Sequence, residues 1–339
     1  ENGMTYYIRH NEKPDNRADF YIAQKVGSVL EEENQRGLAH FLEHMAFNGT
    51  TNLPGMTLRN YLQSRGVKFG ENLNAYTAID ETVYMVTNVQ TDLPGLVDTC
   101  LLILHDWSSF ISLEEAEIDN ERGVILEEER TTGGASRRVM EQLLPKMYPG
   151  SPYGERLPIG TKEVIANFSY QEIRDYYNKW YRPDLQGLII VGDIDVDAIE
   201  ARIKEMFADI PAPVNPAERT RFMIEDNAEP IVAIASDPEL TSTSLQIFYK
   251  HDVTPDEYKQ SPDYWMSQYV LNLISEMQIN RLQELTQKPN PPFVRGYSYF
   301  GDYYLAPTKA AWTSYTMPKD NASIEEALTA LVVENKRMQ

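Results

Sequence analysis

The sequence contains a single cysteine, Cys100, in 339 residues. One thiol cannot close an intrachain disulfide, and a lone cysteine is more often a small buried apolar residue than a nucleophile. Long apolar runs are missing as well: nowhere do about 18 or more apolar residues follow one another, so the sequence predicts no membrane-spanning helix. Neither a disulfide framework nor cysteine chemistry is therefore expected.

Basic residues are scarce. The chain has 31 Lys and Arg against 51 Asp and Glu, which gives a formal net charge of −20. Such a charge repels phosphate backbones, and no stripe of basic residues alternates with aromatic ones. The sequence therefore predicts no nucleic-acid partner.

The chain is longer than the size at which one hydrophobic core keeps growing, so two domains are expected. Three prolines, Pro211, Pro213 and Pro216, lie close together, and such a segment resists both helix and sheet. We place a linker there, which predicts a first domain over residues 1–212 and a second over residues 217–339.

Local patterns predict α+β structure on both sides of this linker. Residues rich in β-branched and aromatic side chains predict strands, and apolar residues at helical spacing predict helices. In the first domain we expect strands at 4–9 and 20–26, paired with each other, at 72–89 and at 188–191, and helices at 34–47, 93–110, 113–130, 169–180 and 196–207. In the second domain we expect strands at 231–235, 244–249 and 310–316, and helices at 264–286 and from 323 onward.

Helix termini carry further signals. Ser112 with Glu115 and Ser169 with Glu172 have the spacing of capping boxes, which predicts the first turns of two helices. The last predicted helix is still amphipathic at Gln339 and has no glycine cap. We therefore expect the natural polypeptide to continue.

The most informative segment lies within the predicted helix 34–47. His40, Glu43 and His44 share one face at about 100° per residue; the opposite face carries Leu38, Phe41, Leu42 and Met45. Two histidines at i and i+4 can direct both imidazoles at one zinc ion, and the carboxylate at i+3 lies beside the open metal position. This is the inverted zincin pattern.

A structural role is the alternative interpretation, because a single histidine on an apolar face is usually a core residue. The chain has only five histidines, so a chance pair with a glutamate at this spacing is rare, and we favour the metal site. His10, His105 and His251 lack ligand-type neighbours at useful spacing. We interpret these three as structural.

A catalytic zinc usually has three protein ligands and one position for water. The predicted helix 113–130 offers Glu121 and Glu128, which are seven positions apart and therefore lie about 20° apart around a helix. Glu127 and Glu129 point to either side and are expected to be solvated. Spacing alone leaves Glu121 and Glu128 as equal candidates for the third ligand.

Several segments resemble the pitrilysin and insulinase family of inverted-motif zinc metallopeptidases, especially its processing-peptidase branch and its bacterial members. The first, GLAHFLEHMAFNGT at residues 37–50, is highly specific. The others are NAYT at 74–77, ERGVILEE at 121–128, YG at 153–154, PIGT at 158–161, WYRP at 180–183, VGD at 191–193 and NRLQEL at 280–285. The resemblance extends over essentially the whole chain.

The resemblance implies a fold and a set of roles. The fold would consist of two similar α/β-sandwich domains of the pitrilysin/processing-peptidase type, the second incomplete in this sequence. His40, His44 and Glu128 would bind one Zn²⁺ per chain, Glu43 would activate water, and Glu121 would support the site from behind. The interval from His44 to Glu128 is longer than usual in the family, and the extra residues fall around 53–68 and 107–112.

Residues 74–77 have two interpretations. The pattern fits a strand with an exposed edge, to which an extended substrate could add, and it fits an ordinary sheet strand equally well. The resemblance favours contact between the backbone of a substrate and Asn74 and Ala75.

The expected activity is that of a zinc-dependent endopeptidase. Zinc would polarise the scissile carbonyl and lower the pKa of its bound water, and Glu43 would take the proton and deliver it to the leaving amine. The resemblance implies short or unfolded polypeptide substrates, a chamber completed by a second peptidase-like half from a longer chain or another subunit, and the bacterial periplasm or cell envelope. The alternatives are a non-catalytic core or recognition subunit of the same family and, less favoured, another kind of zinc hydrolase.

Overall fold

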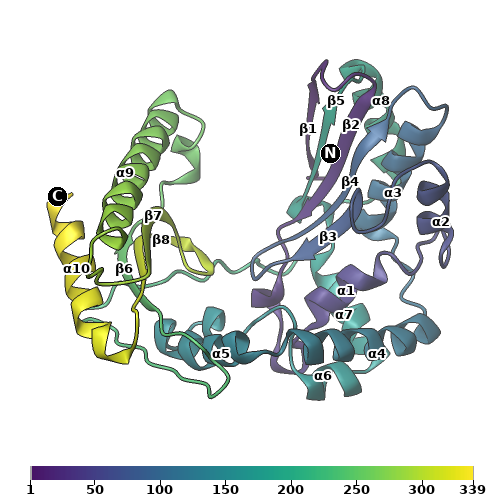
Figure 1. The fold of residues 1–339 in the computed structure, drawn as a ribbon. Coiled ribbons are helices and arrows are strands. Elements are labelled where there is room, and N and C mark those ends of the chain that lie inside the picture. Colours follow the sequence, from purple (N-terminus) through teal and green to yellow (C-terminus); the bar gives the residue numbers. More distant parts are fainter. Residues whose placement is uncertain (1, 339) are drawn as a thin grey trace. The chain divides into compact units, whose positions relative to one another are not determined.

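The computed structural model describes residues 2–338 (Figure 1). They form two compact units, each built from two stretches of chain. The first unit contains the residues up to Gly133 together with Arg156–Thr220, and the second contains Gly134–Glu155 together with the residues from Arg221 onward. The first domain predicted from the sequence, residues 1–212, is one continuous stretch, whereas the first unit of the structure consists of two.

The segment that departs from the first stretch carries helix α5 (Ala135–Met147). Arg138 of α5 pairs with Asp237 at 2.7 Å, and the hydroxyl of Tyr148 donates to the carbonyl of Tyr303 at 2.7 Å. These contacts tie α5 to the second unit. They join residues far apart in the sequence, so no local pattern indicates them.

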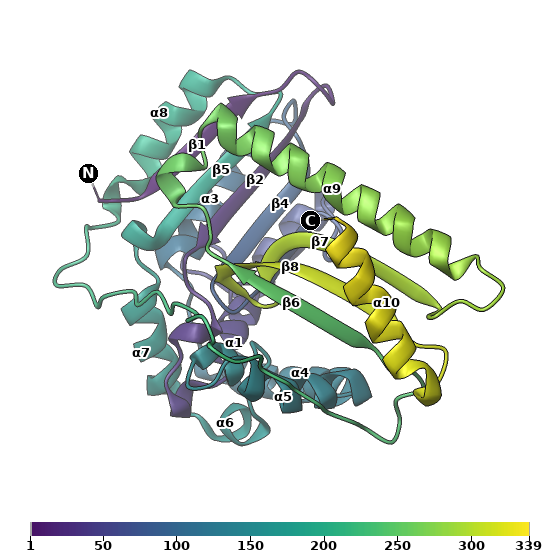
Figure 2. The same ribbon diagram turned by 90° about the vertical axis from the view of Figure 1, so that its left-hand side faces the viewer.

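The first unit contains a five-stranded sheet in the order β1-β5-β2-β4-β3. Its strands are β1 (Thr5–His10), β2 (Arg17–Gln24), β3 (Leu73–Thr77), β4 (Thr82–Gln90) and β5 (Gln186–Gly192). β1 is parallel to β5, and the other pairings are antiparallel. The predicted pairing of the first two strands is therefore wrong, because β5 lies between them (Figure 2).

Seven α-helices of the first unit are described: α1 (Leu38–Met45), α2 (Thr57–Ser64), α3 (Leu96–Ser109), α4 (Glu115–Thr132), α6 (Lys162–Asn167), α7 (Tyr170–Trp180) and α8 (Val196–Met206). α2 and α6 were not predicted. α3 packs along β2 and β4, and α8 lies beside β1. α1 contacts β3, α4 and α7, so it joins the sheet to the helical part of the unit.

The two predicted capping boxes have different outcomes. At α7, the Ser169 side chain accepts from the backbone N–H of Glu172 and the Glu172 side chain bonds back to the Ser169 N–H, which confirms that prediction. Ser112 does not cap α4, which begins at Glu115 and has no side-chain cap. Leu113 has a φ of +50°, so the chain turns away between Ser112 and the helix.

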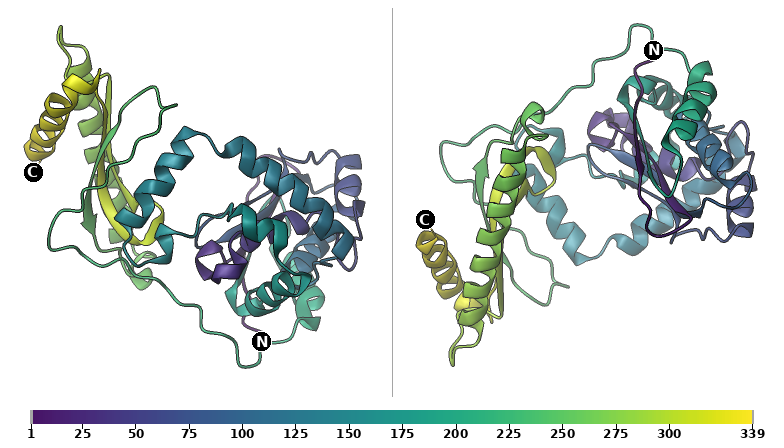
Figure 3. Two further views of the ribbon diagram at one scale, coloured as in Figure 1. Left: turned by 90° about the horizontal axis from the view of Figure 1, so that it is seen from below. Right: turned by 90° about the horizontal axis from the view of Figure 1, so that it is seen from above.

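The second unit contains a three-stranded antiparallel sheet in the order β6-β8-β7. The strands are β6 (Leu245–His251), β7 (Arg295–Tyr303) and β8 (Ala306–Met317), and the two long helices are α9 (Pro262–Thr286) and α10 (Ile324–Arg337). Both helices lie on the same side of the sheet (Figure 3). Leu282, Phe293, Ala327 and Leu331 form a small buried core against the helices.

The predicted strand at 231–235 is wrong, since these residues form no strand and Val232 and Ile234 are each 76% exposed. The order β6-β8-β7 repeats β2-β4-β3 of the first unit, and residues 231–235 precede β6 as β1 precedes β2. In the first unit β1 pairs with β5, which arrives much later in the chain. The described residues of the second unit include no strand equivalent to β5, so residues 231–235 have no strand with which to pair.

The described part of the chain contains no helix with the length and apolar character that a membrane span requires.

Candidate metal centre

Helix α1 has the two faces that its sequence predicts. Leu38, Phe41, Leu42 and Met45 are fully or nearly fully buried, and this apolar face fixes the rotation of the helix in the unit. The imidazoles of His40 and His44 therefore lie on the remaining face, with ring centroids 4.7 Å apart.

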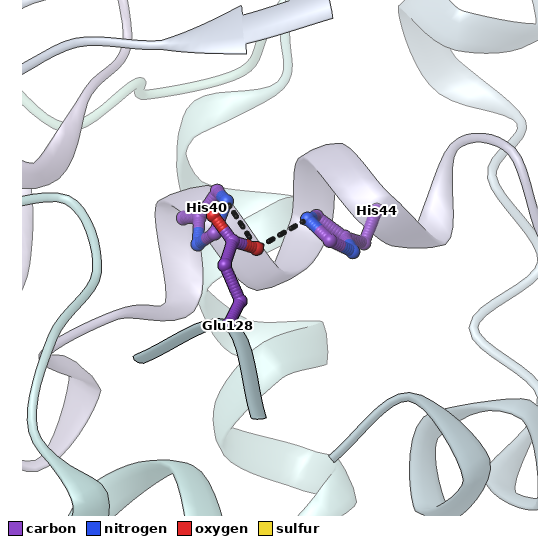
Figure 4. Close-up of side chains that lie close together, drawn as sticks. All are labelled: His40, His44 and Glu128. Atoms are coloured by element: carbon purple, nitrogen blue, oxygen red, sulfur yellow. Dashed lines mark ion pairs between the residues drawn. The ribbon is translucent and has the colours of Figure 1, made fainter. Parts of the chain in front are cut away.

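The structure brings His40, His44 and Glu128 together, with one potential ligand atom from each lying within 4.8 Å of the others (Figure 4). Oε2 of Glu128 is 3.7 Å from Nε2 of His40 and 3.5 Å from Nε2 of His44. Tetrahedral zinc with ligand bonds of about 2.0–2.2 Å separates its ligand atoms by about 3.3–3.6 Å. Both distances from Glu128 are close to this spacing and are too long for ordinary hydrogen bonds, so the chemistry of the three side chains suits one such ion.

Glu121 occupies a different place from Glu128. Its Oε1 lies 2.7 Å from Nδ1 of His44, and its Oε2 accepts from the side-chain amide of Asn48 at 2.6 Å. Burial acts to raise the pKa of Glu121, but these two hydrogen bonds hold it below its usual value. An ionised carboxylate can only accept, so Nδ1 of His44 carries the proton, and in the neutral ring Nε2 keeps a lone pair on the side of Glu128.

The two histidine rings differ in their hydrogen bonding: His44 is bonded by Glu121, and His40 has no such partner among the described residues. Burial alone would lower the pKa of His44, but the hydrogen bond to Glu121 raises it. Nδ1 of His40 is buried and has no hydrogen-bond partner among the described residues, and burial lowers the pKa of His40 to about 4. His40 is therefore a neutral imidazole without an acceptor behind it.

Glu43 lies between the two histidines in the sequence and is only 9% exposed. Burial raises its pKa, and the hydroxyl of Thr77 donates to its Oε2 at 2.7 Å. Thr77 is the last residue of β3. The sequence gives no signal for this hydrogen bond, because Thr77 and Glu43 lie on separate elements 34 residues apart.

Asn74 and Ala75 lie on β3, which is at the edge of its sheet and has β4 as its neighbour among the described strands. Asn74 is exposed and Ala75 is half-buried. The strand therefore lies at a sheet edge, which the interpretation as a site of substrate addition requires. Contact with a substrate stays a prediction.

One expectation about the neighbouring charges is wrong. Glu127 is exposed and bonded to Arg130, as expected, but the Glu129 side chain is only 14% exposed and pairs with Lys162 at 3.0 Å. Glu129 is covered because α6 packs against α4. His105, interpreted as structural, contacts two carboxylates: its Nδ1 is 3.1 Å from Asp106 and its Nε2 is 2.9 Å from Asp209.

An α/β unit with two histidines and a glutamate converging from two helices, beside an edge strand, is the architecture of a metallopeptidase domain. Two family models match: the insulinase model, peptidase family M16, over residues 7–158, and the peptidase M16 inactive-domain model over residues 167–330. The chain belongs to the M16, or insulinase, family of peptidases. This confirms the family and the two-domain α/β fold expected from the sequence motifs.

Relatives and solved structures support the same family. The chain is 34% identical over 298 residues to a zinc protease PQQL-like protein of Arabidopsis thaliana and 32% identical over 289 residues to the probable zinc protease PqqL of Escherichia coli. These matches cover 86% and 85% of this chain but 30% of each relative, so the chain spans about a third of their length. The crystal structure of the first half of the periplasmic protease PqqL from Escherichia coli matches with a TM-score of 0.81 and 28% identity, over 98% of this chain and 70% of that one.

Proposed function

We propose that this chain is the zinc-bearing part of a zinc-dependent endopeptidase. The observation that carries the proposal is the convergence of His40, His44 and Glu128, whose potential ligand atoms lie within 4.8 Å of one another, beside the buried carboxylate of Glu43. Two histidines and a glutamate form the ligand set of several catalytic zinc sites, which leave a fourth position for water.

Each residue of the centre has a distinct role in this proposal. When bound, zinc would polarise the scissile carbonyl and acidify a water molecule. Glu43 would take the proton of that water and pass it to the leaving amine, and burial, which raises the pKa of Glu43, makes this carboxylate a better proton acceptor than an exposed one. Glu121 holds the His44 ring in the tautomer that leaves Nε2 available.

The substrate would bind as an additional strand along the free edge of β3. Backbone groups of an edge strand have no partner on one side and can bond an extended peptide. Asn74 and Ala75 would contact that peptide, and Thr77 bonds Glu43 from the same strand. Short or unfolded polypeptides meet this requirement best, because most backbone groups of a folded chain are already paired within its own helices and sheets.

A second peptidase-like half is the proposed partner. The relatives are about three times longer than the matched segment, and a closed chamber would exclude bulk water and hold a flexible peptide at the metal. We place the protein in the bacterial periplasm or cell envelope, consistent with the periplasmic location of the Escherichia coli PqqL. A non-catalytic subunit is not favoured, because none of the residues required for hydrolysis is replaced.

The test is zinc-dependent cleavage by the full-length protein. Removal of metal by a chelator should abolish cleavage of a quenched, unstructured peptide, and one equivalent of Zn²⁺ should restore it. Ester and phosphate substrates should not be hydrolysed at comparable rates. Full peptide cleavage by the metal-free protein would contradict the proposal.

A further inference from the structure

One buried carboxylate outside the centre is bonded directly to the helix that carries both histidines. Glu31 lies between two short 3₁₀ turns, Ser28–Leu30 and Glu33–Gln35, and is 5% exposed. Its Oε2 accepts from the backbone N–H of Gly37 at 3.0 Å, and its Oε1 accepts from the backbone N–H of Ala39 at 2.8 Å. Both donors belong to the beginning of α1, where the N–H groups have no partner within the helix.

Helix α1 cannot be capped by the residue at its own N-cap position. That residue is Gly37, with a φ of +104° and no side chain. L side chains rarely adopt this φ, and a Cβ there would also lie 3.1 Å from Cα of Gly160 and 2.6 Å from Cδ1 of Ile165. The serine, aspartate or asparagine that would normally serve is therefore strained at this position. The capping group therefore comes from outside, six residues upstream.

Glu31 is itself held in place. Its backbone carbonyl accepts from Nε of Arg156 at 3.2 Å, and the backbone carbonyl of Arg156 accepts from the Ser28 hydroxyl. Burial raises the pKa of Glu31, while the N–H groups of Ala39 and Gly37 and the charge of Arg156 act in the opposite direction and favour the carboxylate, which can accept from both amides. A buried carboxylate has lost its hydration, and without hydrogen-bond donors it would lower the stability of the folded state. The bonds from Gly37 and Ala39 are therefore expected to persist.

His40 is the residue that depends on this arrangement. It is the third residue of α1 and lies in the first helical turn, whereas His44 is one turn further along. Glu121 bonds the His44 ring from behind, but the buried Nδ1 of His40 has no corresponding partner among the described residues. The orientation of the His40 ring is therefore set by packing and by the backbone of the first turn.

We propose that Glu31 is the positioning residue for His40: its carboxylate fixes the first turn of α1 and thereby directs the His40 ring toward Glu128. The two histidines are then held by different means, His44 through its ring and His40 through its backbone. This inference rests on the proposed metal centre. A loosened first turn would displace His40 and leave His44 in place.

The wild-type protein provides a test that requires no variant. Amide hydrogen exchange, measured residue by residue on the full-length protein without metal, should show Gly37 and Ala39 protected, although the first N–H groups of an uncapped helix exchange rapidly. Rapid exchange of both amides would overturn the proposal.

The variant test replaces Glu31 by glutamine. Glu31→Gln keeps the size of the side chain and one acceptor oxygen but turns an NH₂ group against the second backbone N–H. We expect zinc affinity, measured by competition with a chromophoric chelator, to fall about 10- to 100-fold, as for other residues that orient a metal ligand. In the metal-free protein, the NMR signals of the His40 ring should shift and those of His44 should stay.

Two controls separate positioning from charge and from global stability. Glu33→Gln removes an exposed acid two residues away that pairs with Arg156 but is not bonded to Gly37 or Ala39, and it should weaken zinc binding far less than Glu31→Gln does. Leu188→Ala removes a fully buried side chain from β5 and should lower the free energy of unfolding without weakening zinc binding. Equal zinc affinity of Glu31→Gln and Glu33→Gln, or an equal loss in Leu188→Ala, would refute the role of Glu31. If the wild type itself binds no zinc, the metal centre fails, while amide exchange and the His40 signals still decide whether Glu31 orders this helix.

Discussion

Oε1 of Glu121 lies 2.7 Å from Nδ1 of His44, on the side of the ring opposite to the nitrogen that faces Glu128. One helix, α4, thus supplies a carboxylate to each nitrogen of the same imidazole. The two glutamates are seven residues apart and nearly aligned along the helix, which is why the sequence could not choose between them. The surrounding contacts separate their roles.

The first prediction concerns these two carboxylates. Glu128→Gln should weaken zinc binding more than Glu121→Gln, for which a loss of about 10- to 100-fold is expected of a residue that orients a ligand. Glu127→Gln is the matched control, because Glu127 lies on the same helix, is exposed, and bonds to Arg130 rather than to either histidine. Metal competition assays measure all three, and a larger loss in Glu121→Gln than in Glu128→Gln would reverse the assignment.

The second prediction concerns the hydroxyl that reaches Glu43 from β3. Thr77→Val keeps the shape of the side chain but removes the donor to Oε2 of Glu43. Because a hydrogen bond to a charged group is worth about 1.5–3 kcal/mol, kcat should fall about 10- to 100-fold. KM and zinc content should change little, and Thr77→Ser should retain most of the activity. A wild-type kcat in Thr77→Val would remove Thr77 from the mechanism.

The third prediction is a pH dependence of stability that has nothing to do with the metal. Burial acts to lower the pKa of His105, but hydrogen bonds to Asp106 and Asp209 outweigh it and raise the pKa. A raised folded-state pKa means that this stabilisation is fully present below the unfolded value of about 6.5 and is lost as the pH rises through the folded value.

The variant His105→Gln isolates this effect. The difference in the free energy of unfolding between wild type and His105→Gln should therefore be largest near pH 6 and shrink as the pH increases toward 9. Urea denaturation at each pH measures it. A difference that is constant or grows over this range would contradict the pairing.

The fourth prediction concerns the second half. A protein limited to residues 1–339 should bind zinc as well as the full-length protein does, because His40, His44 and Glu128 all come from the first unit. Its peptide cleavage should be slower, because an open site holds a flexible peptide poorly. Turnover of both forms at equal zinc occupancy tests this, and equal rates from a monomeric 1–339 protein would show that no second half is needed.

Much of the fold could be predicted from local patterns. The helical spacing of apolar residues placed α1, and the capping box at Ser169 placed the start of α7. The histidine pair with Glu43 required only the geometry of a single helix. These features depend on residues within a turn or two of each other.

What the sequence could not reveal depends on distant contacts. The placement of β5 between β1 and β2 joins strands that are far apart in the chain. Residues 231–235 have strand-forming side chains but no partner strand among the described residues. The bonds from Thr77 to Glu43 and from Glu31 to α1 likewise link separate elements, and no spacing rule indicates them.

The proposed mechanism assigns zinc binding and proton transfer to different residues of one site. Glu43→Gln in the full-length protein tests it most directly, because the amide keeps the size of the side chain but cannot take a proton, while His40, His44 and Glu128 are unchanged. Zinc content by metal analysis and cleavage of a quenched peptide are measured on the same sample. We expect one zinc per chain and no detectable cleavage; stoichiometric zinc with near wild-type turnover would contradict the role of Glu43 as proton acceptor.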